Sequence, residues 1–356
     1  MATRRGFLAG LVAASAVPRL GWAAVGSPAY LAAAKRPDGS YSLHGLTSAG
    51  SETFSVPLPA RGHAACGHPT RAEAIGFARR PGTFALVIDC PTGMVVRELT
   101  APEGRQFNGH GAFSADGALL FTSEQMEDGS EGRIGVWDTR DYARIDEVPS
   151  HGIGPHEIRL MPDGETLVIA NGGIETDGWD REKLNLMTMR PNLTYLGADG
   201  RHLESMELEP DLHQNSIRHL AIRADGLVAF AMQWEGEANA ALPLLGLHRR
   251  GEAVILAEAP LADELLMKGY AGSIAFAGSG DEVAITSPRG GRLHRFSPDG
   301  TFLGAVSRAD VCGLAPLGAG YFATDGLGGL IAVAPEGPRA LGKAGVAWDN
   351  HLVSLT

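Results

Sequence analysis

Five histidines and one cysteine recur at one position of a long repeat, and their side chains are the first candidates for chemistry. The repeat positions are His63, His110, His156, His219, Gly272, Cys312 and His351, which are separated by 47, 46, 63, 53, 40 and 39 residues. Neutral imidazoles, alone or with a thiolate, bind borderline transition metals such as Fe, Cu, Zn and Ni. The sequence therefore predicts a metal site formed by His63, His110, His156, His219, His351 and Cys312.

Other uses of these histidines stay open. Imidazoles also transfer protons or, when protonated, bind anions. In WD-repeat propellers a Gly-His pair forms hydrogen bonds within its own blade and binds nothing, and both Gly62-His63 and Gly109-His110 match that pair. Alternate residues of a strand face opposite sides, so an error of one residue would turn these side chains away from a shared site.

Polar residues near the repeat position extend the hypothesis. We expect Glu157, Asn171 and Arg218 to orient the ligands or to contact a bound molecule. A second hypothesis is a propeller enzyme, either a redox subunit or a lactonase-like hydrolase. The hydrolase would hold its metal with carboxylate and amide groups, here Glu124, Asn171 and Asp325. A third is a protein-interaction scaffold, in which the histidines would point into interfaces between blades.

Hairpin turns show which elements position these residues. Asp-Gly turns lie at 114–117, 161–164 and 223–226, with a looser turn at 278–281, each between two strand-length apolar runs. A third strand is predicted in each of seven units, and a fourth run follows each of them. The third strands are predicted at 43–46, 84–89, 134–138, 193–196, 244–247, 292–296 and 330–333.

Seven units of four strands are typical of an all-β, seven-bladed β-propeller. The run 348–356 is predicted to be an innermost strand and the run 30–35 a second strand, so that both ends of the chain would complete the first blade. The long insertions 124–133, 171–193 and 233–243 are expected on the same face as the histidines. Only 261–268 is predicted to be helical.

Composition excludes several classes of protein. A net charge of −11 disfavours a general nucleic-acid binder, and 44% hydrophobic residues are enough for a large core. Three cysteines allow at most one disulfide bond within the chain. The run Pro-Arg-Gly-Gly-Arg at 288–292 is predicted to form a turn, with an anion site as the alternative.

The N-terminal residues are predicted to be a signal peptide that ends near residue 23. Residues 3–8 read Thr-Arg-Arg-Gly-Phe-Leu, an apolar run covers 9–17, and Gly-Trp-Ala follows at 21–23. This pattern predicts twin-arginine export to the periplasm, followed by a single propeller domain over 24–356. Beyond residue 20 no stretch is long and apolar enough for a membrane span.

Several runs resemble the domain of unknown function family 1513, from about residue 29 to the C-terminus. The resemblance implies a periplasmic propeller-like protein associated with imelysin-like iron-uptake proteins and a di-haem oxidoreductase-like protein. It supplies no activity and no catalytic residue, but it adds weight to metal handling, with iron or copper as the candidate ion. The matching runs are 61–63, 77–84, 109–111, 152–157, 170–175, 183–185, 216–220, 286–291 and 311–313.

Overall fold

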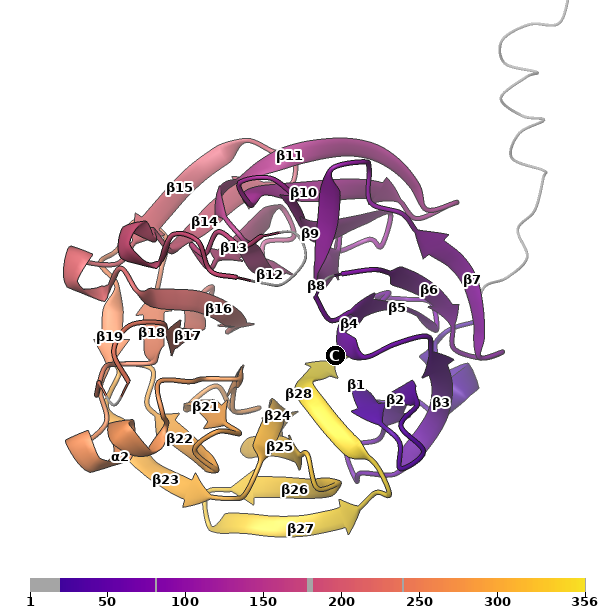
Figure 1. Ribbon diagram of the computed structural model, residues 1–356. Coiled ribbons are helices and arrows are strands. Elements are labelled where there is room, and N and C mark those ends of the chain that lie inside the picture. Colours follow the sequence, from indigo (N-terminus) through magenta and orange to yellow (C-terminus); the bar gives the residue numbers. More distant parts are fainter. Residues whose placement is uncertain (1–19, 81, 178–181, 239, 356) are drawn as a thin grey trace, which may run out of the picture.

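Short strands joined by tight turns make up most of the chain. The computed structural model describes residues 20–80, 82–177, 182–238 and 240–355, and these form seven four-stranded antiparallel sheets arranged in a ring (Figure 1). The predicted seven-bladed β-propeller is thus confirmed. The Arg4-Arg5 pair of the predicted signal lies outside the described residues. Within them, no helix is long and apolar enough to cross a bilayer.

The four strands of each blade follow one another outward from the centre of the ring. Blade 1 contains β28 (Ala347–Ser354), β1 (Tyr30–Lys35), β2 (Tyr41–Leu46) and β3 (Glu52–Leu58); blade 2 contains β4 (Gly62–Gly67), β5 (Glu73–Ala78), β6 (Ala85–Asp89) and β7 (Met94–Leu99). Blade 3 contains β8 (Arg105–Phe113), β9 (Leu119–Met126), β10 (Glu131–Asp138) and β11 (Ala143–Ile153); blade 4 contains β12 (Pro155–Leu160), β13 (Thr166–Asn171), β14 (Asn192–Gly197) and β15 (His202–Glu207).

The remaining three blades have the same plan. Blade 5 contains β16 (Asn215–Ile222), β17 (Val228–Trp234), β18 (Leu245–His248) and β19 (Ile255–Ala257); blade 6 contains β20 (Ser273–Phe276), β21 (Val283–Ser287), β22 (Arg292–Phe296) and β23 (Phe302–Ser307). Blade 7 contains β24 (Val311–Leu317), β25 (Gly320–Asp325), β26 (Gly329–Ala334) and β27 (Gly337–Lys343). Helical turns lie at η1 (Trp22–Val25), η2 (Leu186–Thr188), η3 (Pro210–Leu212) and α2 (Leu261–Leu266).

The two ends of the chain close the ring, as predicted. β28 pairs with β1 in antiparallel fashion, with Leu31 opposite Val353 and Tyr30 opposite Ser354. Every blade therefore has a neighbour on both sides, and no blade exposes its packing face. Seven buried apolar clusters lie in the described part of the chain, one between each pair of adjacent blades.

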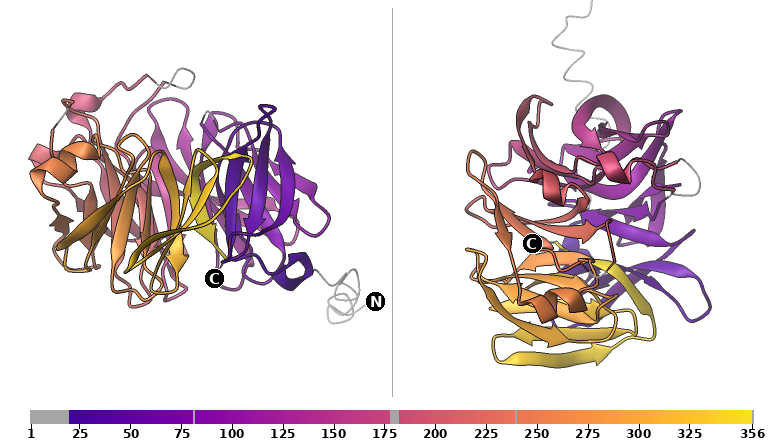
Figure 2. Two further views of the ribbon diagram at one scale, coloured as in Figure 1. Left: turned by 90° about the horizontal axis from the view of Figure 1, so that it is seen from below. Right: turned by 60° about the vertical axis from the view of Figure 1, so that its left-hand side comes forward.

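The Asp-Gly turns lie on one face, and the long connections lie on the other (Figure 2). In the first of these turns, the Asp116 carboxylate accepts a hydrogen bond from the Ala118 amide at 2.9 Å, and Gly117 has a φ of 73° that favours glycine. The predicted insertion 124–133 is wrong in length. β9 runs to Met126 and β10 begins at Glu131, because the strand ladder continues into the insertion.

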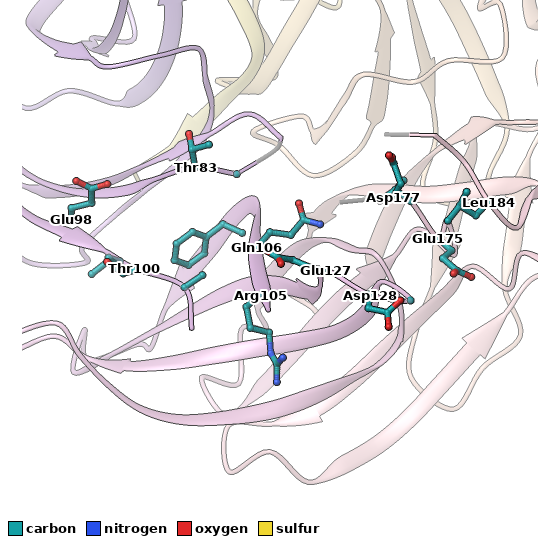
Figure 3. A pocket seen from close by; sticks show the side chains of 16 residues that line it. Thr83, Glu98, Thr100, Arg105, Gln106, Glu127, Asp128, Glu175, Asp177 and Leu184 are labelled. Atoms are coloured by element: carbon teal, nitrogen blue, oxygen red, sulfur yellow. The ribbon is translucent and has the colours of Figure 1, made fainter. Parts of the chain in front are cut away.

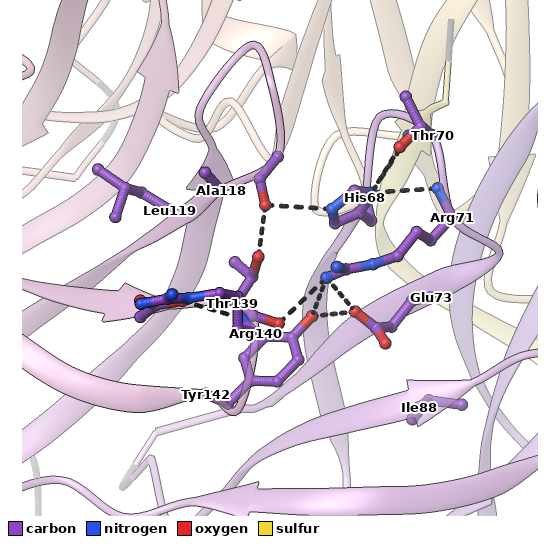
Figure 4. A network of polar contacts seen from close by, with 12 residues as sticks. His68, Thr70, Arg71, Glu73, Ile88, Ala118, Leu119, Thr139, Arg140 and Tyr142 are labelled. Carbon is purple, nitrogen blue, oxygen red and sulfur yellow. Dashed lines mark hydrogen bonds and ion pairs between the residues drawn. The ribbon is translucent and has the colours of Figure 1, made fainter. Parts of the chain in front are cut away.

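A polar network joins blade 2 to blade 3 (Figure 4). Arg71 Nη2 donates to the Glu73 carboxylate at 2.7 Å, and the Tyr142 hydroxyl of blade 3 donates to the same carboxylate. His68 Nε2 also donates to the Gly117 carbonyl of blade 3 at 3.1 Å. This network lies away from the histidine cluster described below and supports the ring rather than a site.

Candidate metal centre

Bulges in the innermost strands position the repeated histidines. In blade 4, Pro155 pairs with Asn171 and Glu157 pairs with Ala170, so that His156 is an extra residue in β12. Comparable register shifts interrupt the innermost strands of blades 1, 2, 3, 5 and 7, in each case at or next to the repeat position. A bulge redirects a side chain that regular alternation would send elsewhere. β20 of blade 6 pairs without a shift, and its repeat position is Gly272.

Five of these six bulged strands bring their imidazoles together at the centre of the ring. Ring centroids of neighbouring histidines lie between 4.4 Å, for His63 and His351, and 6.0 Å, for His110 and His219. We call these five residues the histidine cluster: His63, His110, His156, His219 and His351. The five residues belong to five different blades, so only the closed ring can assemble them.

The ring nitrogens of the cluster fall into two overlapping groups. One nitrogen from each of His63, His110 and His156 lies within 4.8 Å of the other two, and the same holds for His110, His219 and His351. Four buried nitrogens have no hydrogen-bond partner among the described residues: Nδ1 of His63 and His156, and Nε2 of His110 and His351. Leaving a buried polar atom without a partner lowers the free energy of unfolding by about 1–3 kcal/mol, so such atoms usually have a hydrogen-bond partner or a bound ligand.

Burial keeps these imidazoles neutral. Loss of solvation, with repulsion from neighbouring rings, holds the pKa values of His63, His110 and His156 well below the ordinary 6.5. The same cause lowers the pKa of His351 to about 3. At neutral pH these rings therefore carry free lone pairs that a metal can use without displacing a proton.

Glu157 is the acidic residue of the site. Its Oε2 lies 3.3 Å from Nδ1 of His219 and 4.0 Å from Nδ1 of His110, and Arg159 Nε donates to its Oε1 at 2.6 Å. Burial opposes its ionisation, but Arg159, His219 and His351 outweigh burial and lower its pKa to about 2. An ionised carboxylate behind an imidazole fixes the ring tautomer and makes the other nitrogen a better ligand.

Two of the other residues singled out from the sequence lie elsewhere. Cys312 occupies the equivalent bulge of blade 7, but its Sγ lies 3.3 Å from the Asp349 carbonyl oxygen and 3.6 Å from that of Trp348. Burial raises its pKa to about 12, so it remains a thiol. The Asn171 amide donates to the Ser150 carbonyl and accepts from the Ser150 hydroxyl, which ties β11 to blade 4.

The carboxylates required for a lactonase-like metal site are engaged within their own blades. Glu124 is fully buried and accepts two hydrogen bonds from Arg144, at 2.8 and 2.9 Å. Asp325 is likewise buried and is held by Arg308 and by the amide of Gly329. These two carboxylates stabilise strand ends and turns. Among the described residues, neither of them belongs to a cluster of side chains that could hold a metal ion.

The histidine cluster lies between two pockets on the ring axis. The upper pocket, about 230 Å³, lies on the face with the long connections and is lined by His63, His156 and His219, together with Arg218. The lower pocket, about 190 Å³, is lined by His110, His219, His351 and Glu157. His219 borders both, so the cluster can be approached from either side.

A third pocket, of about 680 Å³, lies further out between the connections of blades 2, 3 and 4 (Figure 3). Its lining is strongly acidic: Asp128, Glu175 and Asp177 lie on one side and Glu98 on the other. The charged side chains that line the upper pocket, by contrast, are basic except for one glutamate. The two neighbouring pockets on this face therefore differ in charge.

Comparisons with known proteins identify relatives but no activity. Residues 56–355 match the family described as "Protein of unknown function (DUF1513)". No curated protein matches the chain. Among solved structures, a chain of "Kuenenia stuttgartiensis Hydrazine Synthase" is similar with a TM-score of 0.59 and 15% sequence identity, covering 89% of this chain and 96% of that one. At that identity the likeness concerns the fold alone.

Proposed function

The chain belongs to the DUF1513 family of proteins of unknown function, and we propose that its histidine cluster binds a transition-metal ion. One observation carries this proposal: five imidazoles from five blades meet at the ring axis, and four of their buried nitrogens have no partner among the described residues. The bulges turn these imidazoles toward one another without forming hydrogen bonds between them, which does little for packing. The same arrangement suits a ligand that the imidazoles share.

His110, His219 and His351 are the primary ligands in this proposal. Their nitrogens lie within 4.8 Å of one another, so small ring rotations bring them to about 2 Å from one ion. Glu157 stands behind His219 and near His110, as an outer carboxylate does in protein metal sites. His63 and His156 extend the site toward the upper pocket.

The ligand set selects the class of metal. Neutral imidazoles suit iron, copper, zinc and nickel, and they are poor ligands for Mg²⁺ and Ca²⁺, which prefer oxygen. We propose iron or copper as the natural ion. In vitro we expect Cu²⁺ to bind more tightly than Fe²⁺, because nitrogen sites follow that general order.

We also propose that the protein works in the periplasm as an accessory to iron uptake. The twin-arginine pattern around Arg4 and Arg5 and the resemblance to proteins found beside imelysin-like and di-haem oxidoreductase-like proteins support this setting. Fractionation of cells that express the full chain, compared with an Arg4→Lys/Arg5→Lys variant, tests export. We expect only the parent to reach the periplasm. If the variant reached the periplasm as the parent does, the twin-arginine route would be contradicted.

Metal titration tests the site itself. Metal-free protein is titrated with Cu²⁺, Fe²⁺ and Zn²⁺ in competition with a coloured chelator, for the parent and for a His110→Ala/His219→Ala variant. Mutating a residue that only supports a metal ligand typically weakens metal binding by about 10–100-fold, and removing two ligands should weaken it by more than that. His202→Ala is the matched control, because His202 is exposed on β15. Equal affinities for all three proteins, with unchanged circular dichroism, would reject the site.

A further inference from the structure

The upper pocket concentrates positive charge in an acidic protein. Five basic residues line it, against one acidic residue, Glu235, whereas the whole chain has a net charge of −11. The basic residues come from four different blades or connections: Arg79, Arg80, Lys183, Arg218 and Arg289. A concave site lined by one sign of charge focuses the field and attracts ligands of opposite sign.

The acidic residue does not neutralise this lining. Glu235 forms an ion pair with Lys183, and its other oxygen lies 3.8 Å from Arg218 Nη2. Arg79 and Arg289 have no ion-pair partner among the described residues. The guanidinium of Arg289 lies 4.2 Å from the centre of the Tyr270 ring, so a stacking contact holds it at the rim without satisfying its charge.

Arg218 is the strongest indication of a ligand. It is the extra residue of the bulge in β16, because Ile217 pairs with Met232 and His219 pairs with Ala231. Its side chain is only 12% exposed, and its Nε has no hydrogen-bond partner in the described structure. Burying a guanidinium with a single distant carboxylate is costly, and a bound anion would offset that cost.

We infer that the upper pocket binds a compact oxyanion with two or more negative charges. Arg218 contacts it from the floor beside His219, and Arg289 contacts it from the rim. At about 30 Å³ per water, a volume of 230 Å³ equals about seven or eight waters, which suits a small dicarboxylate or a phosphate group. Arginine recognises the oxygens of both by paired hydrogen bonds.

The same anion would lie next to the proposed metal, and this part rests on the proposed function. His63, His156 and His219 line the pocket that holds the anion and also belong to the histidine cluster. An ion bound by neutral imidazoles keeps its positive charge, so anion and metal should each strengthen the binding of the other. The site would then accept a metal together with its anionic chelator.

Calorimetric titration of metal-free protein tests the pocket at constant ionic strength, with succinate and phosphate as probes and acetate as the monovalent comparison. We expect binding of at least one divalent probe and much weaker binding of acetate. Arg218→Gln and Arg289→Gln should each raise its Kd by about tenfold or more. Arg339→Gln removes the same charge from the exposed outer strand β27 and should change the Kd less than about twofold. Arg289 is exposed, so its variant remains informative if Arg218→Gln does not fold.

The pattern of results distinguishes a carboxylate ligand from a phosphate ligand. It also distinguishes failure of the anion pocket from failure of the metal site. Binding of succinate alone identifies a carboxylate ligand, and binding of phosphate alone identifies a phosphate ligand. Repeating the titration with Cu²⁺ bound should lower the Kd by about fivefold or more. No binding of either probe to protein that does bind metal overturns this inference and leaves the metal site standing. Anion binding without metal binding rejects the proposed function instead.

Discussion

Glu157 couples the charge of the site to the orientation of its ligands. Its carboxylate contacts Nδ1 of His219 at 3.3 Å and also accepts a hydrogen bond from the Leu220 amide at 3.2 Å. We predict that Glu157→Gln weakens Cu²⁺ binding by about 10–100-fold, because the amide removes the negative charge that supports the imidazoles. Competition titration measures the change.

A matched variant separates this effect from general loss of charge. Glu207→Gln removes a carboxylate from β15, where Glu207 forms an exposed ion pair with Arg190. Its metal affinity should equal that of the parent. If Glu157→Gln also binds Cu²⁺ as the parent does, Glu157 has no part in the site.

The repeat position alone predicted which five histidines meet, because equivalent positions of propeller blades come together at the axis. It could not distinguish Cys312 from them. Cys312 lies in an equivalent bulge, but its thiol turns to the carbonyl groups of blade 1. The bulges themselves depend on pairing between strands, and a single sequence carries no local signal for them.

Ser123 holds two bulges in place from the second strand of blade 3. Its hydroxyl lies 3.1 Å from the carbonyl oxygens of both His110 and His156. We predict that Ser123→Ala lowers the free energy of unfolding by about 1–2 kcal/mol, because a buried carbonyl loses its donor. It should also weaken Cu²⁺ binding. Denaturant unfolding and metal titration of the same variant measure both effects, and a loss of stability with unchanged affinity would contradict the link.

The helix α2 carries a buried acid whose protonation should set part of the pH dependence. Burial raises the pKa of Glu264 to about 7, from 4.5, and its Oε1 accepts a hydrogen bond from the Ala259 amide at 2.8 Å. The folded protein therefore holds a proton that the unfolded chain loses above pH 4.5. The stability due to this group is complete at low pH and is lost as the pH rises through 7.

Glu264→Gln keeps the acceptor oxygen and removes the titration. We predict that this variant exceeds the parent in stability by about 1–3 kcal/mol at pH 8, and that the difference shrinks toward zero near pH 4. Thermal unfolding across this range measures it. A difference that does not vary with pH would show that Glu264 does not titrate between these limits.

Most strands could be located from hairpin turns and apolar runs, with boundaries that differ from the structure by a few residues. The predicted strand 292–296 coincides with β22, whereas β10 begins three residues before the predicted 134 because its ladder with β9 extends. The basic lining of the upper pocket was not predicted as a set. Its arginines come from connections and a bulge, where neither periodicity nor spacing indicates a common direction.

Ring closure ties the fold to the site in a single step. β28 supplies the innermost strand of blade 1 and also carries His351, whose ring lies 4.4 Å from that of His63. The charge of the molecule is organised around the same axis, with basic groups over the cluster and acidic groups in the pocket further out. A propeller that did not close would not assemble the site, and it would expose the packing faces of two blades.

Removing residues 347–356 should therefore unfold the ring rather than only remove a ligand. β28 buries Trp348, Leu352 and Val353, worth roughly 5–9 kcal/mol at about 1.5–3 kcal/mol for each side chain. That equals most of the ~5–15 kcal/mol that stabilises a typical domain. We expect the truncated chain to lack a cooperative thermal transition and to be cleaved rapidly in limited proteolysis. His351→Ala, which keeps β28, should remain folded and lose metal affinity; a truncated chain as resistant as this control would show that closure is not what holds the blades together.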